Sequence, residues 1–97
     1  MERQKILRKM AGNIRDIRTR FAVKKLFVFG SAARGTAKKR SDIDILVVFS
    51  KKATFDLFMD LKFYLEELLE TKVDLVTDKA LRPEVKKAIQ RELINVA

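Results

Sequence analysis

The chain alternates apolar runs with amphipathic segments, and this pattern predicts a mixed helix and strand arrangement. Residues 3–20 place apolar side chains three or four positions apart, which is the spacing of a helix that covers a core with one face. Three short runs rich in aromatic and β-branched residues, 25–29, 42–49 and 72–77, are typical of buried strands. Residues 32–35 are expected to form a short helical turn.

Two further helices are predicted from capping signals and periodicity. Thr54 suits an N-cap and Asp56 falls in the first turn, where the helix dipole favours an acid, so a helix should run to about residue 70. Its apolar stripe is wide, which indicates either a protein interface or a larger core. Pro83 suits the first turn of a last helix. The positions expected to face the core from this last helix are Val85, Ile89, Leu93 and Val96.

The predicted order is helix, strand, short helix, strand, helix, strand, helix. We therefore expect an α+β fold with a small three-stranded sheet flanked by helices, as one domain over residues 1–97. A compact chain of this length has a radius of gyration of roughly 12 Å, which leaves room for one core.

The amino-acid composition limits the kinds of catalytic and metal site that the chain can form. The 22 Lys and Arg outnumber the 13 Asp and Glu, and the net charge of +9 attracts polyanions without choosing among them. The absence of Cys and His excludes disulfides, thiol nucleophiles and Ser-His-Asp triads. A general base must then be a carboxylate, Lys or Tyr, and a metal site must offer oxygen ligands to a hard cation such as Mg²⁺, Mn²⁺ or Ca²⁺. No apolar stretch is long enough for a membrane span, so a cytoplasmic protein is expected.

Two acids begin the second predicted strand. Asp42 and Asp44 are two residues apart, so in a strand their side chains point to the same face. Neighbouring carboxylates repel, and a divalent metal ion would remove that penalty. The alternative is that Asp42 caps the strand while Asp44 pairs with a Lys or Arg.

A third acid, Asp74, interrupts the apolar run of the third predicted strand. A buried Asp needs a charge partner or a metal ion. If the second and third strands are neighbours, Asp74 lies beside Asp44, and three carboxylates could bind one or two Mg²⁺ ions. The alternative for Asp74 is a salt bridge at a sheet edge.

Gly30 and Ser31 end the first predicted strand. A glycine there lets a phosphate approach the backbone, and a serine at the start of a helical turn offers a hydroxyl and an N–H. Several cations follow closely and could neutralise a triphosphate: Arg34, Lys38, Lys39 and Arg40. Taken alone, this segment is also compatible with an ordinary turn and a solvated loop. A P-loop is excluded, because Thr36 stands where that motif has Lys.

Together these residues spell G-S-x10-D-x-D, from Gly30 to Asp44. This pattern resembles the signature of the DNA polymerase β-type nucleotidyltransferase superfamily, and Asp74 matches its third carboxylate. The wider sequence, over about residues 22–97, resembles the minimal nucleotidyltransferases (MNT proteins), including the MntA-like antitoxins of HEPN/MNT toxin–antitoxin pairs. The resemblance implies the nucleotidyltransferase fold.

The resemblance also implies roles for individual residues. Gly30 and Ser31 would hold the triphosphate of ATP. Asp42 and Asp44 would bind one or two Mg²⁺ ions, and Asp74 would assist with metal binding and with activating the acceptor hydroxyl. Supporting nucleotide-binding positions would be Arg34 and Ser41.

The function implied is transfer of AMP from ATP to a hydroxyl, most simply a tyrosine of a partner HEPN ribonuclease toxin. One alternative is the same chemistry on a small molecule or nucleic acid. Another is an antitoxin that acts by docking without catalysis. Sequence-independent nucleic-acid binding ranks last, because the basic residues are dispersed and no aromatic platform accompanies them. Formation of homo-oligomers is left open.

Overall fold

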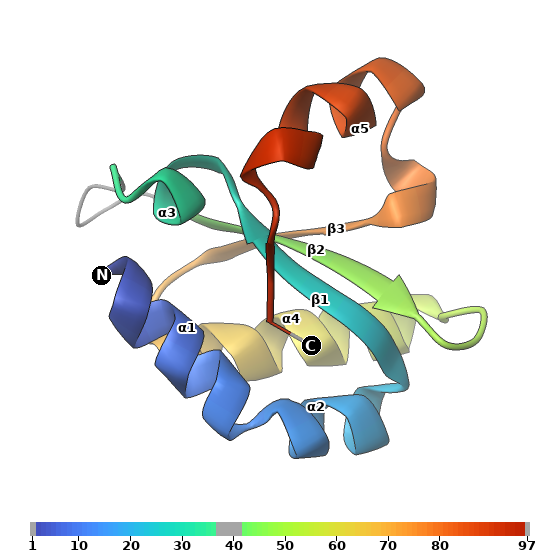
Figure 1. Cartoon of the computed structure of the whole chain (residues 1–97). Coiled ribbons are helices and arrows are strands. Elements are labelled where there is room, and N and C mark those ends of the chain that lie inside the picture. The colour runs from blue at the N-terminus through green and yellow to red at the C-terminus, as the bar shows by residue number, and fades with distance from the viewer. Residues whose placement is uncertain (1, 37–41, 97) are drawn as a thin grey trace.

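A four-stranded mixed sheet forms the centre of the computed structural model, which describes residues 2–36 and 42–96 (Figure 1). The strands are β1 (Val23–Phe29), β2 (Ile43–Phe49), β3 (Val73–Thr77) and β4 (Ile94–Asn95). Their order across the sheet is β3-β2-β1-β4. Strand β1 is antiparallel to both β2 and β4, whereas β2 and β3 are parallel.

Three helices cover one face of this sheet (Figure 1). They are α1 (Arg3–Gly12), α2 (Ile14–Phe21) and α4 (Phe55–Leu69). Helix α4 connects β2 to β3, which is the crossover that a parallel pair of strands requires. The other face lies toward the C-terminal segment, so the two faces have different surroundings.

The core lies between the sheet and these three helices. Alternate residues of β2, namely Ile43, Ile45 and Val47, are buried against it. Helix α4 contributes Leu61, Leu65 and Leu69, spaced four residues apart and each fully buried. The alternation leaves Asp44 and Leu46 on the opposite face of the same strand.

The predicted helix over residues 3–20 is in fact two helices. Asn13 interrupts it with φ −117° and ψ 12° and caps the end of α1, where its side-chain Nδ2 donates to the Lys9 carbonyl at 2.8 Å. Gly12 and Asn13 are both weak helix formers, so the chain can bend here at little cost. The apolar stripe survives the bend, since Ile6, Met10 and Ile17 are all buried.

The N-terminus of α4 follows the prediction. The Thr54 side chain accepts a hydrogen bond from the Leu57 N–H at 3.1 Å, and Asp56 lies in the first turn. The wide apolar stripe is only partly core, because Phe55 is 75% exposed and Phe63 is 57% exposed.

The C-terminal prediction is wrong in two respects. The last helix, α5 (Pro83–Ile89), is short. It is followed by a 3₁₀ turn and a strand that the sequence pattern did not predict. These are η2 (Gln90–Glu92) and β4, which adds a fourth strand by pairing Ile94 with Val28. The β-branched residues near the end favour a strand, and the free edge of β1 supplies the partner. Val85, expected to face the core, is 41% exposed.

The remaining elements are α3 (Gly30–Arg34) and the 3₁₀ turn η1 (Asp78–Ala80). Among the described residues, no helix combines the length and apolar character needed to cross a membrane.

We predict that two substitutions in α4 differ sharply in their effect on stability. Leu65→Ala removes a fully buried side chain and should lower the free energy of unfolding by about 2–5 kcal/mol. Phe63→Ala removes a larger side chain that is mostly exposed, and should change it by about 0.5 kcal/mol or less. Urea unfolding followed by circular dichroism measures both, and equal losses would contradict the assignment of the core face.

Candidate active site

Two carboxylates lie side by side on the sheet face opposite the core. Asp44 of β2 is the register partner of Asp74 of β3, because the two strands are parallel and in register. Asp42 precedes β2 by one residue and is exposed, Asp44 is half-buried, and Asp74 is exposed. The expectation that strands two and three are neighbours is therefore confirmed.

The proximity of these acids contributes to a raised pKa of Asp44. The pKa of the Asp44 carboxyl is raised from 3.8 to about 6, first by burial and next by the charge of Asp74. A hydrogen bond between the two carboxyl groups acts in the same direction, followed by the charges of Asp42 and Glu92. The side chains thus crowd negative charge into one place, which favours a bound proton or cation.

The donor set suits a hard cation, since it consists of carboxylate oxygens alone. Over residues 2–36 and 42–96, however, no group of three or more acidic side chains is arranged to enclose a metal ion. The acids are therefore a close pair, Asp44 and Asp74, with Asp42 near enough to influence the pKa of Asp44. Mg²⁺ commonly binds proteins through one or two carboxylates and completes its shell with water and substrate phosphates. The pair fits that mode of binding.

Gly30 stands directly against this pair. It follows β1, whose last residue Phe29 is the register partner of Asp44. Gly30 has φ +70°, a conformation that favours glycine, and a Cβ at this position would overlap the carboxyl group of Asp44. The glycine is required both by its backbone conformation and by the closeness of the acid, so the two halves of the G-S-x10-D-x-D motif meet in space.

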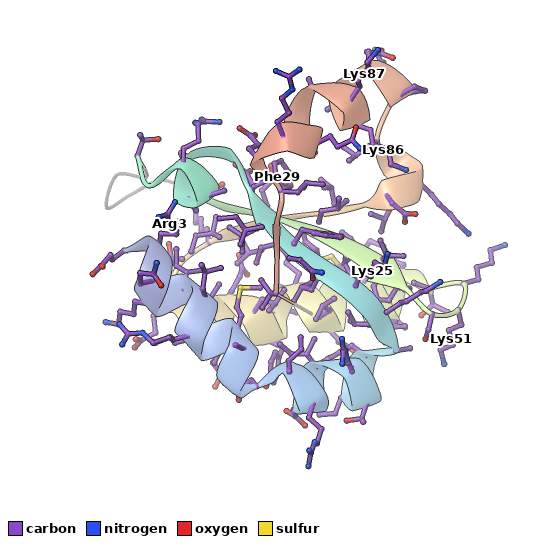
Figure 2. All side chains as sticks on the ribbon, in the orientation of Figure 1. Arg3, Lys25, Phe29, Lys51, Lys86 and Lys87 are labelled. Carbon is purple, nitrogen blue, oxygen red and sulfur yellow. The ribbon has the colours of Figure 1, made fainter. Side chains whose placement is uncertain are left out.

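The short helix α3 begins at Gly30 and carries Ser31, which is half-buried, and Arg34, which is exposed. The Arg3 guanidinium of α1 donates to the Ala33 carbonyl at 3.2 Å. This hydrogen bond ties α3 to the N-terminal helix, and Figure 2 shows Arg3 beside α3. The predicted residue Ser41 lies outside the described residues. The same holds for Lys38, Lys39 and Arg40.

One residue of this site was missed by the sequence analysis. The Glu92 carboxylate, from the turn η2, accepts a hydrogen bond from the Gly30 N–H at 3.1 Å through Oε1. Its other oxygen, Oε2, lies 2.6 Å from Nη1 of Arg34. Glu92 is 62 residues from Gly30 in sequence, and it falls in a segment that was expected to be helical, so no local signal could have identified it.

An apolar cleft of ≈ 410 Å³ adjoins the acids on the same sheet face. Phe27, Leu46 and Val48 form its floor, and Leu46 is the next residue after Asp44 on this face of β2. Pro83 and Ile89 of α5 line the side away from the sheet. Lys25, Lys86 and Lys87 also line it, and Figure 2 shows the two last on α5. An organic group with a negatively charged part could be held here next to the carboxylates.

Comparisons with known proteins show the family of this chain. The family model described as "Nucleotidyltransferase domain" matches residues 10–96. The chain is 43% identical over 82 residues to the protein adenylyltransferase MntA of Thermococcus cleftensis, covering 84% of this chain and 83% of that protein.

Solved structures show the same fold. One described as a minimal nucleotidyltransferase superposes with a TM-score of 0.83 at 35% identity, covering 97% of this chain and 95% of the other. A second, of the tri-AMPylated HEPN toxin of Shewanella oneidensis in complex with its MNT antitoxin, gives a TM-score of 0.70 at 20% identity, covering 98% of this chain and 71% of the other. At that identity the second likeness shows the fold alone. With the family model spanning nearly the whole sequence, and with Gly30 and the acids meeting at one corner of the sheet, the chain belongs to the nucleotidyltransferase domain family.

Proposed function

We propose that this protein transfers AMP from ATP, with Mg²⁺, to a tyrosine hydroxyl of a partner HEPN toxin, and so acts as an antitoxin. The observation that carries the proposal is the close approach of Gly30 to Asp44, the register partner of Asp74, in a chain of the nucleotidyltransferase family. The relative from T. cleftensis is named a protein adenylyltransferase, and the S. oneidensis fold neighbour is bound to an AMPylated HEPN toxin.

The residues of α3 bind the nucleotide in this proposal. The Gly30 N–H and the Arg34 guanidinium are hydrogen-bond donors on one side of the helix, since both now contact the same carboxylate. Phosphate oxygens are the natural acceptors for such donors. Ser31 adds a hydroxyl at the same turn, and Ser41 is assigned a supporting role from the sequence motif.

The carboxylates have a different role from the donors of α3. The Asp44 and Asp74 pair would hold Mg²⁺, with Asp42 assigned as a further ligand from the sequence motif. When bound, Mg²⁺ offsets the negative charge of the triphosphate and of the leaving pyrophosphate. Asp74 also accepts the proton of the acceptor hydroxyl. That oxygen forms a bond to the α-phosphorus of ATP as the bond to pyrophosphate breaks, and pyrophosphate leaves. The negative charges crowded around Asp44 support this proposal, because a bound cation would reduce their repulsion of a triphosphate.

The cleft beneath α5 has space for a flat organic group beside the acids. We assign it to the acceptor side chain or the base of the nucleotide, whose rings would pack on Phe27 and Leu46. The exposed Phe55 and Phe63 of α4 lie on the far side of the core and are available to a protein partner.

The first test is the transfer of α-labelled ATP, with Mg²⁺, to the protein encoded by the neighbouring gene. We expect label on the partner and none after addition of EDTA. Asp44→Ala should lower the rate at least about 100-fold, because the charge stabilisation supplied by a metal ion is worth several kcal/mol.

The matched control for this test is Glu84→Ala, which removes an exposed acid of α5. It should transfer at the normal rate. Normal transfer by Asp44→Ala would show that the assigned site is wrong. A stable complex that silences the partner without any label would favour a docking antitoxin instead.

The conformation of Gly30 leads to a second prediction. Gly30→Ala introduces a Cβ that overlaps the Asp44 carboxyl and strains a backbone with positive φ, so it should lower the free energy of unfolding by about 1–3 kcal/mol. It should also weaken the binding of ATP, measured by calorimetry. Gly12→Ala is the control: nothing lies within 4 Å of its Cβ position, and stability should stay the same or rise slightly. Equal effects of the two substitutions would argue against the close contact.

The raised pKa of Asp44 predicts a dependence of stability on pH in the metal-free protein. Because the folded state binds this proton more tightly than the unfolded chain, the stability it contributes is complete below pH 3.8 and is lost as the pH rises to about 6. Relative to Asp44→Asn, the wild type should lose about 1 kcal/mol between acidic and neutral pH, after allowance for screening of a half-exposed carboxyl. Urea unfolding in EDTA measures this difference, and parallel pH profiles would contradict it.

A further inference from the structure

Glu92 bridges the two hydrogen-bond donors that the proposed nucleotide site offers to a phosphate. Its Oε1 accepts from the Gly30 N–H at 3.1 Å, and its Oε2 lies 2.6 Å from Nη1 of Arg34. A carboxylate that accepts one backbone N–H and one guanidinium N–H makes the same pair of charge-assisted hydrogen bonds that two oxygens of a phosphate would make. The anion in this position is part of the protein itself.

The two hydrogen bonds of Glu92 are of normal to short length, but water reaches both side chains of its ion pair. The Arg34 side chain is 54% exposed and that of Glu92 is 23% exposed. Ion pairs with this degree of exposure contribute little net stability, because water competes for both charges. An incoming triphosphate, which carries several negative charges, can therefore displace the carboxylate without disrupting the core.

The carboxylate and a phosphate cannot share these donors. Both are anions, and Glu92 also adds its negative charge to the group of acids around Asp44. A phosphate that accepted from the Gly30 N–H would lie against the Glu92 carboxylate at close range, where like charges repel. Occupancy of the donors by one anion thus excludes the other.

Glu92 is positioned by the C-terminal segment. The turn η2 leads directly into β4, where Ile94 pairs with Val28, and the Val96 N–H donates to the Leu26 carbonyl at 2.8 Å. This segment, red in Figure 1, runs antiparallel to β1, and its turn η2 contacts α3. The carboxylate is therefore held in place by the pairing of the residues that follow it with β1, and not by its own ion pair alone.

We propose that Glu92 is an internal competitor of the nucleotide, which holds the Gly30 N–H and the Arg34 guanidinium until a triphosphate displaces it. This inference rests on the proposed function, because it takes these two donors as the phosphate-binding groups. Glu92 acts through Gly30 and Arg34 and is a positioning residue. In the protein without nucleotide, Glu92 keeps the two donors oriented. It also raises the concentration of ATP that is needed to occupy the site.

The test is calorimetric binding of inorganic triphosphate and of ATP, with Mg²⁺, to the full chain. Glu92→Gln keeps the size and one hydrogen-bond acceptor but removes the charge. It should bind both ligands about fivefold more tightly than the wild type, which is what the loss of one exposed competing ion pair corresponds to. The same change should lower the KM for ATP in the transfer reaction more than it changes kcat.

The matched control is Glu84→Gln, which removes the same charge from an exposed position in the first turn of α5. Its affinity for triphosphate should equal that of the wild type, and thermal unfolding of each variant checks that it is folded. A merely structural role of Glu92 would give weaker binding or lower stability in Glu92→Gln, and not a gain in affinity. Unchanged or weaker binding by Glu92→Gln overturns the inference.

The two proposals can fail separately. If the wild type transfers no AMP but Glu92→Gln gains affinity for inorganic triphosphate, the role of Glu92 stands and the proposed function fails. If the wild type transfers AMP and Glu92→Gln gains no affinity, the function stands and the role of Glu92 is wrong. If neither protein binds triphosphate, the donors are not a phosphate site and the inference is overturned.

Discussion

The parallel pairing of β2 with β3 is the constraint on which the rest of the structure depends. It places Asp44 opposite Asp74, and it exists because α4 carries the chain from the end of one strand back to the start of the next. The fully buried leucines of α4 fix that helix to the core face of the sheet. The side-chain alternation of β2 then sends Ile43 and Ile45 into the core and Asp44 to the other face. A hydrophobic interaction on one side thus sets the spacing of charges on the other.

The close approach of the acidic side chains lowers the stability of the fold but favours the binding of a cation. Burial, the register partner Asp74 and the nearby charges of Asp42 and Glu92 keep the pKa of Asp44 well above its ordinary value. Repulsion among the carboxylates destabilises a site of this kind at neutral pH when no cation is bound. A divalent cation removes that repulsion. Gly30 makes the crowding possible, because any larger residue would occupy the space of the Asp44 carboxyl.

Sequence analysis was sufficient wherever the signal was local. The spacing of Asp42 and Asp44, the strand around Asp74 and the Thr54 cap are all encoded within a few residues, and the structure bears out the strands and the cap. Periodicity could not show the bend at Asn13, since both helices share one apolar stripe. It also failed after Pro83, because β4 forms only where the edge of β1 offers a partner, and Glu92 contacts residues about sixty positions away. The metal and nucleotide roles of the site residues stay predictions.

The corner formed by α3 is assembled from both ends of the chain. Arg3 reaches it from the first helix, and Glu92 reaches it from the last turn before β4. Contacts between residues so distant in sequence form late in folding, because a long loop must close first. During synthesis, the Gly30 amide therefore acquires its Glu92 partner only after residue 92 has left the ribosome. A truncated or stalled chain would contain every residue of the G-S-x10-D-x-D motif and still lack the carboxylate that we assign to limiting nucleotide entry.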